Sequence, residues 1–372
     1  MSNLLHTPEG VRDIYGNEYA RKLAIEDRLH ETIRCYGYED IQTPTFEFFD
    51  MYSSKIGTTP SNELYKFFDK EGNTLVLRPD FTPSMARCAA KYFMEEQVPI
   101  RFSYNGNTFT NTSNLQGKLK EVTQMGAELI NAPSVEADAE IISLVIEALK
   151  NIGLTRFQVT IGEVDYFKGL CEEAGLDEET EMALRSCISG KNYFAVQELL
   201  AERKVQEPYH SILLKLADMF ETRESLTEAK KVVQNPRSLN AISRLEKLYE
   251  VLKLYGVEEY VSFDLGMLSN YNYYTGVIFK AYTYGVGDAV VKGGRYDNLL
   301  NQFGKEASAI GFVIVVDDIM EALSRQKVEV KLPSAKQTVS YKAGDSADYA
   351  EKLKFVQQLR HDGIAVEFIP EA

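Results

Sequence analysis

The sequence has few of the residues that bind metal ions or form disulfides. Its four histidines contain no H-E-x-x-H spacing, and its four cysteines contain no C-x-x-C spacing. We therefore expect no metal site, no cofactor, and free thiols in a reducing compartment. The histidines are His6, His30, His210 and His361, and the cysteines are Cys35, Cys88, Cys171 and Cys187.

Long apolar runs and blocks of positive charge are also missing. No segment approaches the roughly 20 apolar residues that a membrane span needs, and the first ten residues lack a signal-peptide core. We therefore expect a cytoplasmic protein without a membrane partner. The 41 Lys and Arg against 55 Asp and Glu give a formal net charge of −14. Such a charge repels polyanions, so tRNA is not an expected partner.

The length of 372 residues predicts two or three domains. Strand patterns before and after a helical excursion indicate one mixed α+β domain, formed by residues 1–166 and 257–328. A 3.6-residue period with almost no strand signal predicts a helical insertion over residues 167–256. Residues 333–372 show one strand, one helix and one strand. About 40 residues bury too small a core alone, so this small α/β unit must lean on the main domain or be a remnant.

A hairpin-like stretch over residues 104–130 carries the first candidate site. The alternation of a strand places Met125, Ala127 and Leu129 on one face and Gln124 and Glu128 on the other. The glycine at position 126, between the two polar residues, suits a close approach of a ligand or of backbone. Taken alone, the segment favours a solvated outer sheet face over a binding surface.

Three further segments have patterns that suit a site. Thr82 followed by a proline predicts the N-cap and first turn of a helix. Tyr274, in a tyrosine-rich strand pattern, is expected to share a face with Gly276, so that its hydroxyl reaches across a pocket with a glycine floor; ordinary strand packing is the alternative. In GGRYDNLL (residues 293–300) two glycines allow close backbone approach, and Arg295 and Asp297 are expected to pair.

Taken in order, these segments resemble the catalytic core of class II histidyl-tRNA synthetases over residues 7 to about 326. The resemblance rests on TPEGVRD, GYEDIQTPTFE, LRPDFT, QMGAE, YYTG, GGRYDNLL and GFVIVVDDI. It implies an antiparallel sheet flanked by helices, in a dimer. It also implies that seven residues fall at positions where the family holds free histidine. These are Asp80, Thr82, Gln124, Glu128, Tyr273, Tyr274 and Tyr296.

The side-chain chemistry agrees with that implication. Glu128 and a tyrosine hydroxyl can hydrogen-bond the two imidazole nitrogens, while Asp80 and Gln124 can bind the α-ammonium group. The resemblance therefore favours a ligand-binding role for the polar sheet face over a solvated one.

Three arginines of the synthetase pattern are replaced here. The F-R pair of the hairpin ends in Thr110, the R-G-L before the double tyrosine begins with Ser269, and the E-R of the last motif ends in Asp318. An activating synthetase needs such arginines to hold ATP and to stabilise the charge that develops during adenylate formation. Losing one such donor typically costs about 10²- to 10³-fold in rate. We therefore expect no adenylation and no aminoacylation.

A synthetase core that keeps the histidine pocket but loses the ATP chemistry resembles the family of ATP phosphoribosyltransferase regulatory subunits. The resemblance implies a non-catalytic protein that the short catalytic subunit requires for activity. It implies allosteric feedback inhibition by L-histidine at the first step of histidine biosynthesis, and a homodimer within a hetero-oligomer, suggested to be a hetero-octamer. The loop of residues 113–120 is a candidate lid, with an ordinary mobile loop as the alternative. The alternative functions are an adenylating synthetase and a stand-alone histidine sensor.

Overall fold

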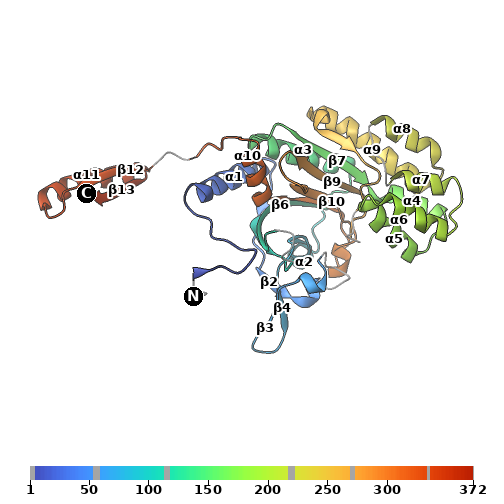
Figure 1. The fold of residues 1–372 in the computed structure, drawn as a ribbon, viewed down its shortest axis with the longest axis horizontal. Coiled ribbons are helices and arrows are strands. Elements are labelled where there is room, and N and C mark those ends of the chain that lie inside the picture. Colours follow the sequence, from blue (N-terminus) through green and yellow to red (C-terminus); the bar gives the residue numbers. More distant parts are fainter. Residues whose placement is uncertain are drawn as a thin grey trace.

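The computed structural model describes residues 5–52, 59–112, 118–216, 223–268, 273–332 and 336–371. Within these ranges, the centre of the molecule is an eight-stranded sheet with the strand order β1-β5-β6-β11-β10-β9-β7-β8 (Figure 1). The strands are β1 (Glu39–Asp40), β5 (Ile100–Phe109), β6 (Glu121–Ile130), β7 (Phe157–Glu163), β8 (Val261–Phe263), β9 (Val277–Thr283), β10 (Val291–Arg295) and β11 (Ala309–Val315).

The expected antiparallel sheet is correct for the centre and wrong at both edges. All neighbouring pairs from β5 to β7 are antiparallel, whereas β1 pairs in parallel with β5 and β8 pairs in parallel with β7. Parallel neighbours require a crossover connection. The chain makes one between β7 and β8 through a run of helices, and another between β1 and β5 through helix α2 (Thr82–Tyr92).

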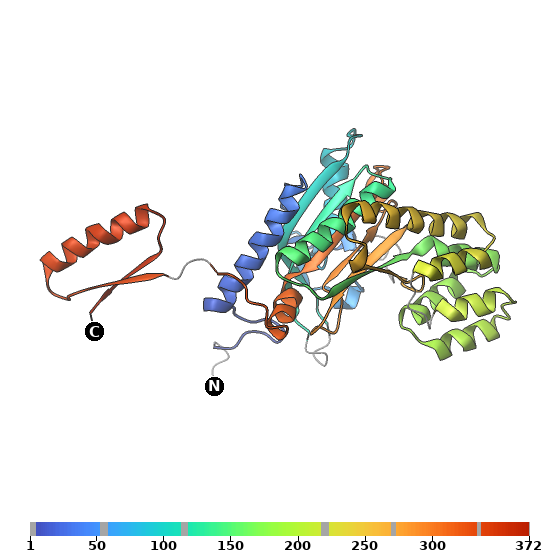
Figure 2. The ribbon, with the colours of Figure 1, turned by 90° about the horizontal axis from the view of Figure 1, so that it is seen from above.

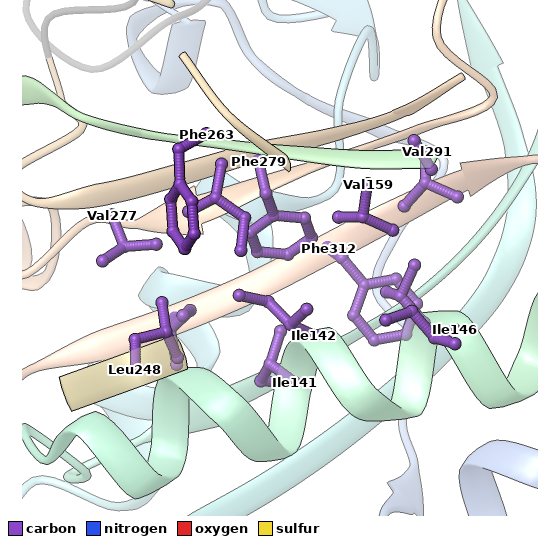
Figure 3. Close-up of a cluster of buried hydrophobic side chains, with 14 of the residues drawn as sticks. Ile141, Ile142, Ile146, Val159, Leu248, Phe263, Val277, Phe279, Val291 and Phe312 are labelled. Atoms are coloured by element: carbon purple, nitrogen blue, oxygen red, sulfur yellow. The ribbon is translucent and has the colours of Figure 1, made fainter. Parts of the chain in front are cut away.

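One face of the sheet packs on a layer of helices that forms the main core. Figure 3 shows Ile141, Ile142 and Ile146 of helix α3 (Val135–Asn151) directed towards Phe279 and Phe312 of the sheet. These side chains are almost completely buried, and each contributes roughly 1.5–3 kcal/mol to folding. Three further helices contribute to this layer. They are α1 (Gly16–Cys35), α9 (Pro236–Tyr255) and α10 (Val316–Arg325).

The opposite face of the sheet is covered by α2 and short segments. Phe81 and Met85, at the start of α2, pack with Phe102 and Tyr104 of β5 in a second buried cluster. Three-residue and four-residue turns of 3-10 helix occur here and elsewhere. They are η2 (Phe49–Tyr52), η3 (Ser61–Glu63), η5 (Glu258–Tyr260) and η6 (Leu300–Phe303). The candidate site lies on this second face.

Between β7 and β8 the described residues form only helices, in the region where the sequence predicts a helical insertion. These helices are α4 (Val164–Glu173), α5 (Glu178–Ser189), α6 (Tyr193–Glu202), α7 (Tyr209–Leu216), α8 (Arg223–Val232) and α9. Helix α9 begins where the side chain of Asn235 accepts a hydrogen bond from the Ser238 amide, and it ends at Gly256, whose φ is 69°. It packs on both α3 and α4, so it joins the helical segment to the core layer.

Two smaller units complete the described fold. A three-stranded sheet in the order β2-β4-β3 lies below the main sheet in Figure 1. Its strands are β2 (Phe46–Phe48), β3 (Lys66–Phe68) and β4 (Thr74–Leu77). The last unit contains β12 (Gln337–Tyr341), α11 (Ser346–His361) and β13 (Val366–Pro370), with β12 and β13 in parallel.

The C-terminal strand, helix and strand follow the pattern that the sequence predicts. Both views show the unit standing apart from the main domain (Figures 1 and 2). Its own packing consists of the buried Val356 and a ring cluster, in which Phe368 lies 4.6 Å from Tyr341 and 5.1 Å from Tyr349 between centroids. None of the helices in the described ranges combines the length and the apolar character that a bilayer crossing requires.

Candidate functional site

A cavity of about 210 Å³ lies on the sheet face that α2 covers. Its described lining comes from β6, β10, β11, the entry to α2 and the segment before β9. All seven residues at which the sequence predicts histidine contacts line it, together with Thr110. These seven are Asp80, Thr82, Gln124, Glu128, Tyr273, Tyr274 and Tyr296. Segments far apart in the sequence thus form one polar site.

Strand register explains how the floor of this cavity is built. Glu128 of β6 lies opposite Gly311 of β11, which lies opposite Gly294 of β10. Paired residues project from the same face of a sheet. A Cβ atom at position 311 would lie 1.6 Å from a Glu128 carboxylate oxygen, and one at position 294 would lie 2.7 Å from the Tyr274 ring. Glycine is therefore needed at both positions to leave room for the site's side chains.

The prediction that Gly276 forms the floor of the pocket is wrong. Strand β9 begins at Val277, so Tyr274 lies in the segment before the strand and not on it. A Cβ atom on Gly276 would approach Arg295 and Glu163 instead of the cavity. The Tyr274 ring lies 4.6 Å from that of Tyr273, which holds both rings at the cavity wall.

Glu128 is the most deeply buried polar group of the site, with 1% of its surface exposed. The Tyr296 hydroxyl donates to its Oε2 atom at 2.6 Å, and the Thr82 hydroxyl donates to Oε1 at 3.2 Å. Burial raises the Glu128 pKa to about 8; the neighbouring Asp80 also raises it, while the two hydrogen bonds oppose the shift. At neutral pH the carboxyl group is therefore mostly protonated, and it can donate to a ligand nitrogen.

The carboxylate of Asp80, and not the hydroxyl of Thr82, accepts a hydrogen bond from the first amide of helix α2. The Thr82 amide donates to the Asp80 carboxylate at 2.9 Å, while the Thr82 hydroxyl is directed to Glu128. The expected N-cap at Thr82 is wrong by one position, because Phe81 is the N-cap residue and Thr82 is the first residue of the helix. Asp80 thus binds the first amide of the helix and also lines the cavity.

Tyr104 is a buried residue that packs behind the described cavity lining, and sequence reasoning missed it. It lies opposite Gly126 in the hairpin register, its hydroxyl donates to the Phe312 carbonyl at 3.4 Å, and its ring stacks on Phe81 at 4.4 Å between centroids. A Cβ atom on Gly126 would lie 2.4 Å from the Tyr104 hydroxyl. Gly126 therefore makes room for a tyrosine and for the β11 backbone. The cross-strand pairing of a tyrosine with a glycine was the signal available in the sequence.

Arg295 forms the predicted pair with Asp297 at 3.2 Å, and a shorter, buried one with Asp138 at 2.5 Å. Arg244 of helix α9 binds the other oxygen of Asp138, also at 2.5 Å. Burial raises the Asp138 pKa, and the two guanidinium groups oppose that shift. Asp138 therefore ties the end of β10, directly before Tyr296, to the helical segment. Sequence reasoning missed it because it sits inside a regular amphipathic helix.

A second buried carboxyl group, Glu163, lies at the end of β7 outside the cavity lining. Among the described residues its Oε2 atom has no hydrogen-bond partner, and burial raises its pKa to about 8. It resembles Glu128 in burial and titration, although it does not line the cavity. It therefore serves below as a matched control.

A larger neighbouring cavity of about 1350 Å³ shares Thr110, Lys292 and Val315 with the first. Asp317 and Asp318 of α10 line it. Asp317 is tied into the fold, since it binds Lys22 and accepts from the Thr123 amide at 2.7 Å. Burial, together with nearby carboxylates, raises the Asp318 pKa to about 6.

Two features predicted from the sequence lie partly or wholly outside the residues that the structure describes. Ser269 lies outside the described residues, as do residues 113–117 of the candidate lid. Among the described residues, no group of histidine, cysteine and carboxylate side chains is arranged to hold a metal ion.

Comparison with known proteins first defines the class. The histidyl-tRNA synthetase family model matches residues 10–319. The histidyl-tRNA synthetase from Nostoc sp. PCC 7120 superposes with a TM-score of 0.82 over 99% of this chain and 86% of that chain, at 19% identity, which establishes the shared fold. The fold is therefore that of a class II, histidyl-tRNA synthetase-like protein.

Three relatives narrow this class. An ATP phosphoribosyltransferase regulatory subunit from Acetivibrio thermocellus is 40% identical over 98% of this chain and 86% of the relative. Another, from Thermoanaerobacter sp. strain X514, is 38% identical over 98% of this chain and 94% of the relative. The crystal structure of an ATP phosphoribosyltransferase regulatory subunit/histidyl-tRNA synthetase from Bacillus halodurans superposes with a TM-score of 0.88, at 34% identity, over 99% and 93% of the two chains. The chain belongs to the family of ATP phosphoribosyltransferase regulatory subunits.

Proposed function

We propose that this chain is the non-catalytic regulatory subunit of ATP phosphoribosyltransferase and that it binds L-histidine as a feedback inhibitor. The observation that carries the proposal is the gathering of seven polar and aromatic residues in one cavity, beside a second cavity lined by Thr110 and Asp318. The chain would activate the short catalytic subunit at the first step of histidine biosynthesis, in the cytoplasm.

The cavity chemistry suits free histidine. Glu128 and a tyrosine hydroxyl provide partners for the two imidazole nitrogens at the buried end. Asp80 and Gln124 provide acceptors for an α-ammonium group. A ligand that leaves such buried polar groups unpaired binds far more weakly, so the site discriminates by hydrogen bonding as well as by size.

The same geometry argues against adenylation. Thr110 lines both cavities at a position where synthetases place an arginine, and Asp318 lines the larger one at another such position. A carboxylate beside triphosphate repels it, and each missing guanidinium costs about 10²- to 10³-fold in rate. We therefore propose that the chain does not aminoacylate tRNA, which its net charge of −14 also disfavours as a partner.

An exposed aromatic face supports assembly of two copies. Phe46 lies opposite Leu77, and Phe48 and Phe67 both lie opposite Leu75, so these five side chains share one face of the small sheet. Phe46, Phe48 and Phe67 are 53%, 57% and 37% exposed. Clustered exposed aromatics of this kind mark interaction surfaces. We propose a homodimer within a hetero-oligomer with the catalytic subunit, with the hetero-octamer as the expected size.

Calorimetric titration of the purified chain tests the proposal. L-histidine should bind in the absence of ATP, and ATP alone should not bind tightly. Tyr274→Phe should weaken histidine binding and histidine inhibition while the variant still activates the short catalytic subunit. Loss of activation with intact histidine binding would count against the site. Because coupling is reciprocal, substrates of the catalytic subunit should in turn weaken histidine binding.

Two assays separate the alternative functions. ATP-dependent pyrophosphate exchange by this chain would show that it is an adenylating synthetase. If the chain binds histidine but does not bind the short catalytic subunit in a pull-down, it would be a stand-alone histidine sensor.

A further inference from the structure

The described lining of the 210 Å³ cavity contains a single cationic side chain, that of Lys292. The other ionisable groups of that lining are the carboxyl groups of Asp80 and Glu128 and the tyrosine hydroxyls. A free amino acid brings an α-carboxylate as well as an α-ammonium group. None of the contacts assigned above provides a cation for that carboxylate.

Register places Lys292 at the far end of the cavity from Glu128. Lys292 of β10 lies opposite Val313 of β11, which lies opposite Gly126 of β6. Glu128 therefore lies on the same face of the sheet as Lys292. The two residues are separated by two strand spacings across the sheet and by two residues along the strand direction. With a strand spacing of about 4.8 Å and a rise of about 3.4 Å per residue, the two Cα atoms lie about 12 Å apart.

One cavity joins these two ends, because Glu128 and Lys292 both belong to its described lining. The positions between them include Gly311 and Gly294, whose missing side chains make room for the Glu128 carboxyl group and the Tyr274 ring. An imidazole ring held by Glu128 would then direct the rest of the amino acid across this floor towards β10. The Lys292 side chain, which extends from the same face, can meet the carboxylate from the opposite end.

The present partner of Lys292 does not prevent this contact. Its ammonium group lies 3.1 Å from a carboxylate oxygen of Asp288, and the two side chains are 39% and 53% exposed. Ion pairs that are this exposed are weak, so the ammonium group can exchange or share its partner.

We propose that Lys292 binds the α-carboxylate of the amino-acid ligand, an inference that rests on the proposed function of the cavity. Lysine offers a single point charge on a flexible stem, whereas arginine offers a planar fork that also clamps phosphates. A lysine at this position therefore supports binding of a free amino acid without rebuilding a site for ATP. Ligands that keep the imidazole and the amine but lack the carboxylate should bind more weakly.

The test is a calorimetric comparison of L-histidine with histamine, which lacks only the carboxylate. The full chain is titrated with each ligand as wild type, Lys292→Met, Lys292→Arg and Lys280→Met. Lys280 is the matched control, because it lies directly opposite Lys292 on β9 but does not belong to the described lining of either cavity.

Wild type should prefer L-histidine over histamine by about 10- to 100-fold, the usual range for a hydrogen bond to a charged group. Lys292→Met should reduce that preference to about 1- to 3-fold by weakening histidine alone, Lys292→Arg should retain most of it, and Lys280→Met should leave it unchanged. Equal weakening of both ligands by Lys292→Met, or no weakening of histidine, would overturn this inference alone. Failure of wild type to bind either ligand would overturn the proposed function and this inference with it.

Discussion

The buried carboxyl group of Glu128 should make the stability of the fold depend on pH, and one substitution should remove that dependence. Its pKa in the folded protein is about 8, against an ordinary value of 4.5. The raised value means that the folded state holds the proton more tightly than the unfolded state. The contribution to stability is therefore fully present below about pH 4.5 and is lost as the pH rises to about 8.

The magnitude follows from proton linkage. With pKa values of 4.5 and about 8, ionisation costs the fold about 1 kcal/mol at pH 5 and about 4 kcal/mol at pH 8. Glutamine has the same shape, does not titrate, and still offers an oxygen to the Tyr296 hydroxyl at the 2.6 Å position. The stability of Glu128→Gln relative to wild type should therefore rise by roughly 3 kcal/mol between pH 5 and pH 8.

Urea denaturation of both proteins at several pH values between 5 and 8 measures this difference. Glu163→Gln is the matched control, because its pKa is raised to a similar extent but the residue does not line the cavity. Both variants should show the same trend in stability, while only Glu128→Gln should weaken histidine binding. A stability difference that stays constant across this pH range for Glu128→Gln would mean that the carboxyl group is ionised in the folded protein, and would refute the burial argument.

Three further predictions address packing, cavity shape and chemistry. Asp138→Ala should lower the free energy of unfolding in urea by about 3–5 kcal/mol, because it removes the buried partner of the Arg295 guanidinium group and leaves that group only the partly exposed Asp297, whereas Arg244→Ala should cost less, since Asp138 keeps its second arginine. Gly311→Ala should abolish histidine binding in calorimetry, because its Cβ would lie 1.6 Å from a carboxylate oxygen of the site; Gly287→Ala, with nothing within 4 Å, should not. Thr110→Arg alone should not restore pyrophosphate exchange, and exchange by this variant would contradict the argument from the lost arginines.

Local patterns in the sequence were sufficient for much of the fold. The alternation over residues 121–130 correctly separates the buried Met125 and Leu129 from the face that carries Glu128, because strand geometry imposes a period of two. The helical period likewise identifies the region between β7 and β8. The pairing of Arg295 with Asp297 was predictable because the two residues lie two positions apart at a strand end.

Other predictions failed where contacts between distant segments decide the outcome. Strand β9, which pairs with the distant β7, begins at Val277 and does not include Tyr274. The parallel edges of the sheet depend on crossover connections, which local periodicity does not encode.

The sequence by itself determined which side chains are available to the site. It carries Glu128 and the tyrosines that suit an imidazole, and it lacks arginine at Thr110 and Asp318. Only the tertiary structure decided how these groups act, because burial and proximity arise from segments more than a hundred residues apart. Burial raises the pKa of Glu128, Asp138 joins the strand of the site to helix α9, and the register of β10 turns Lys292 towards the cavity.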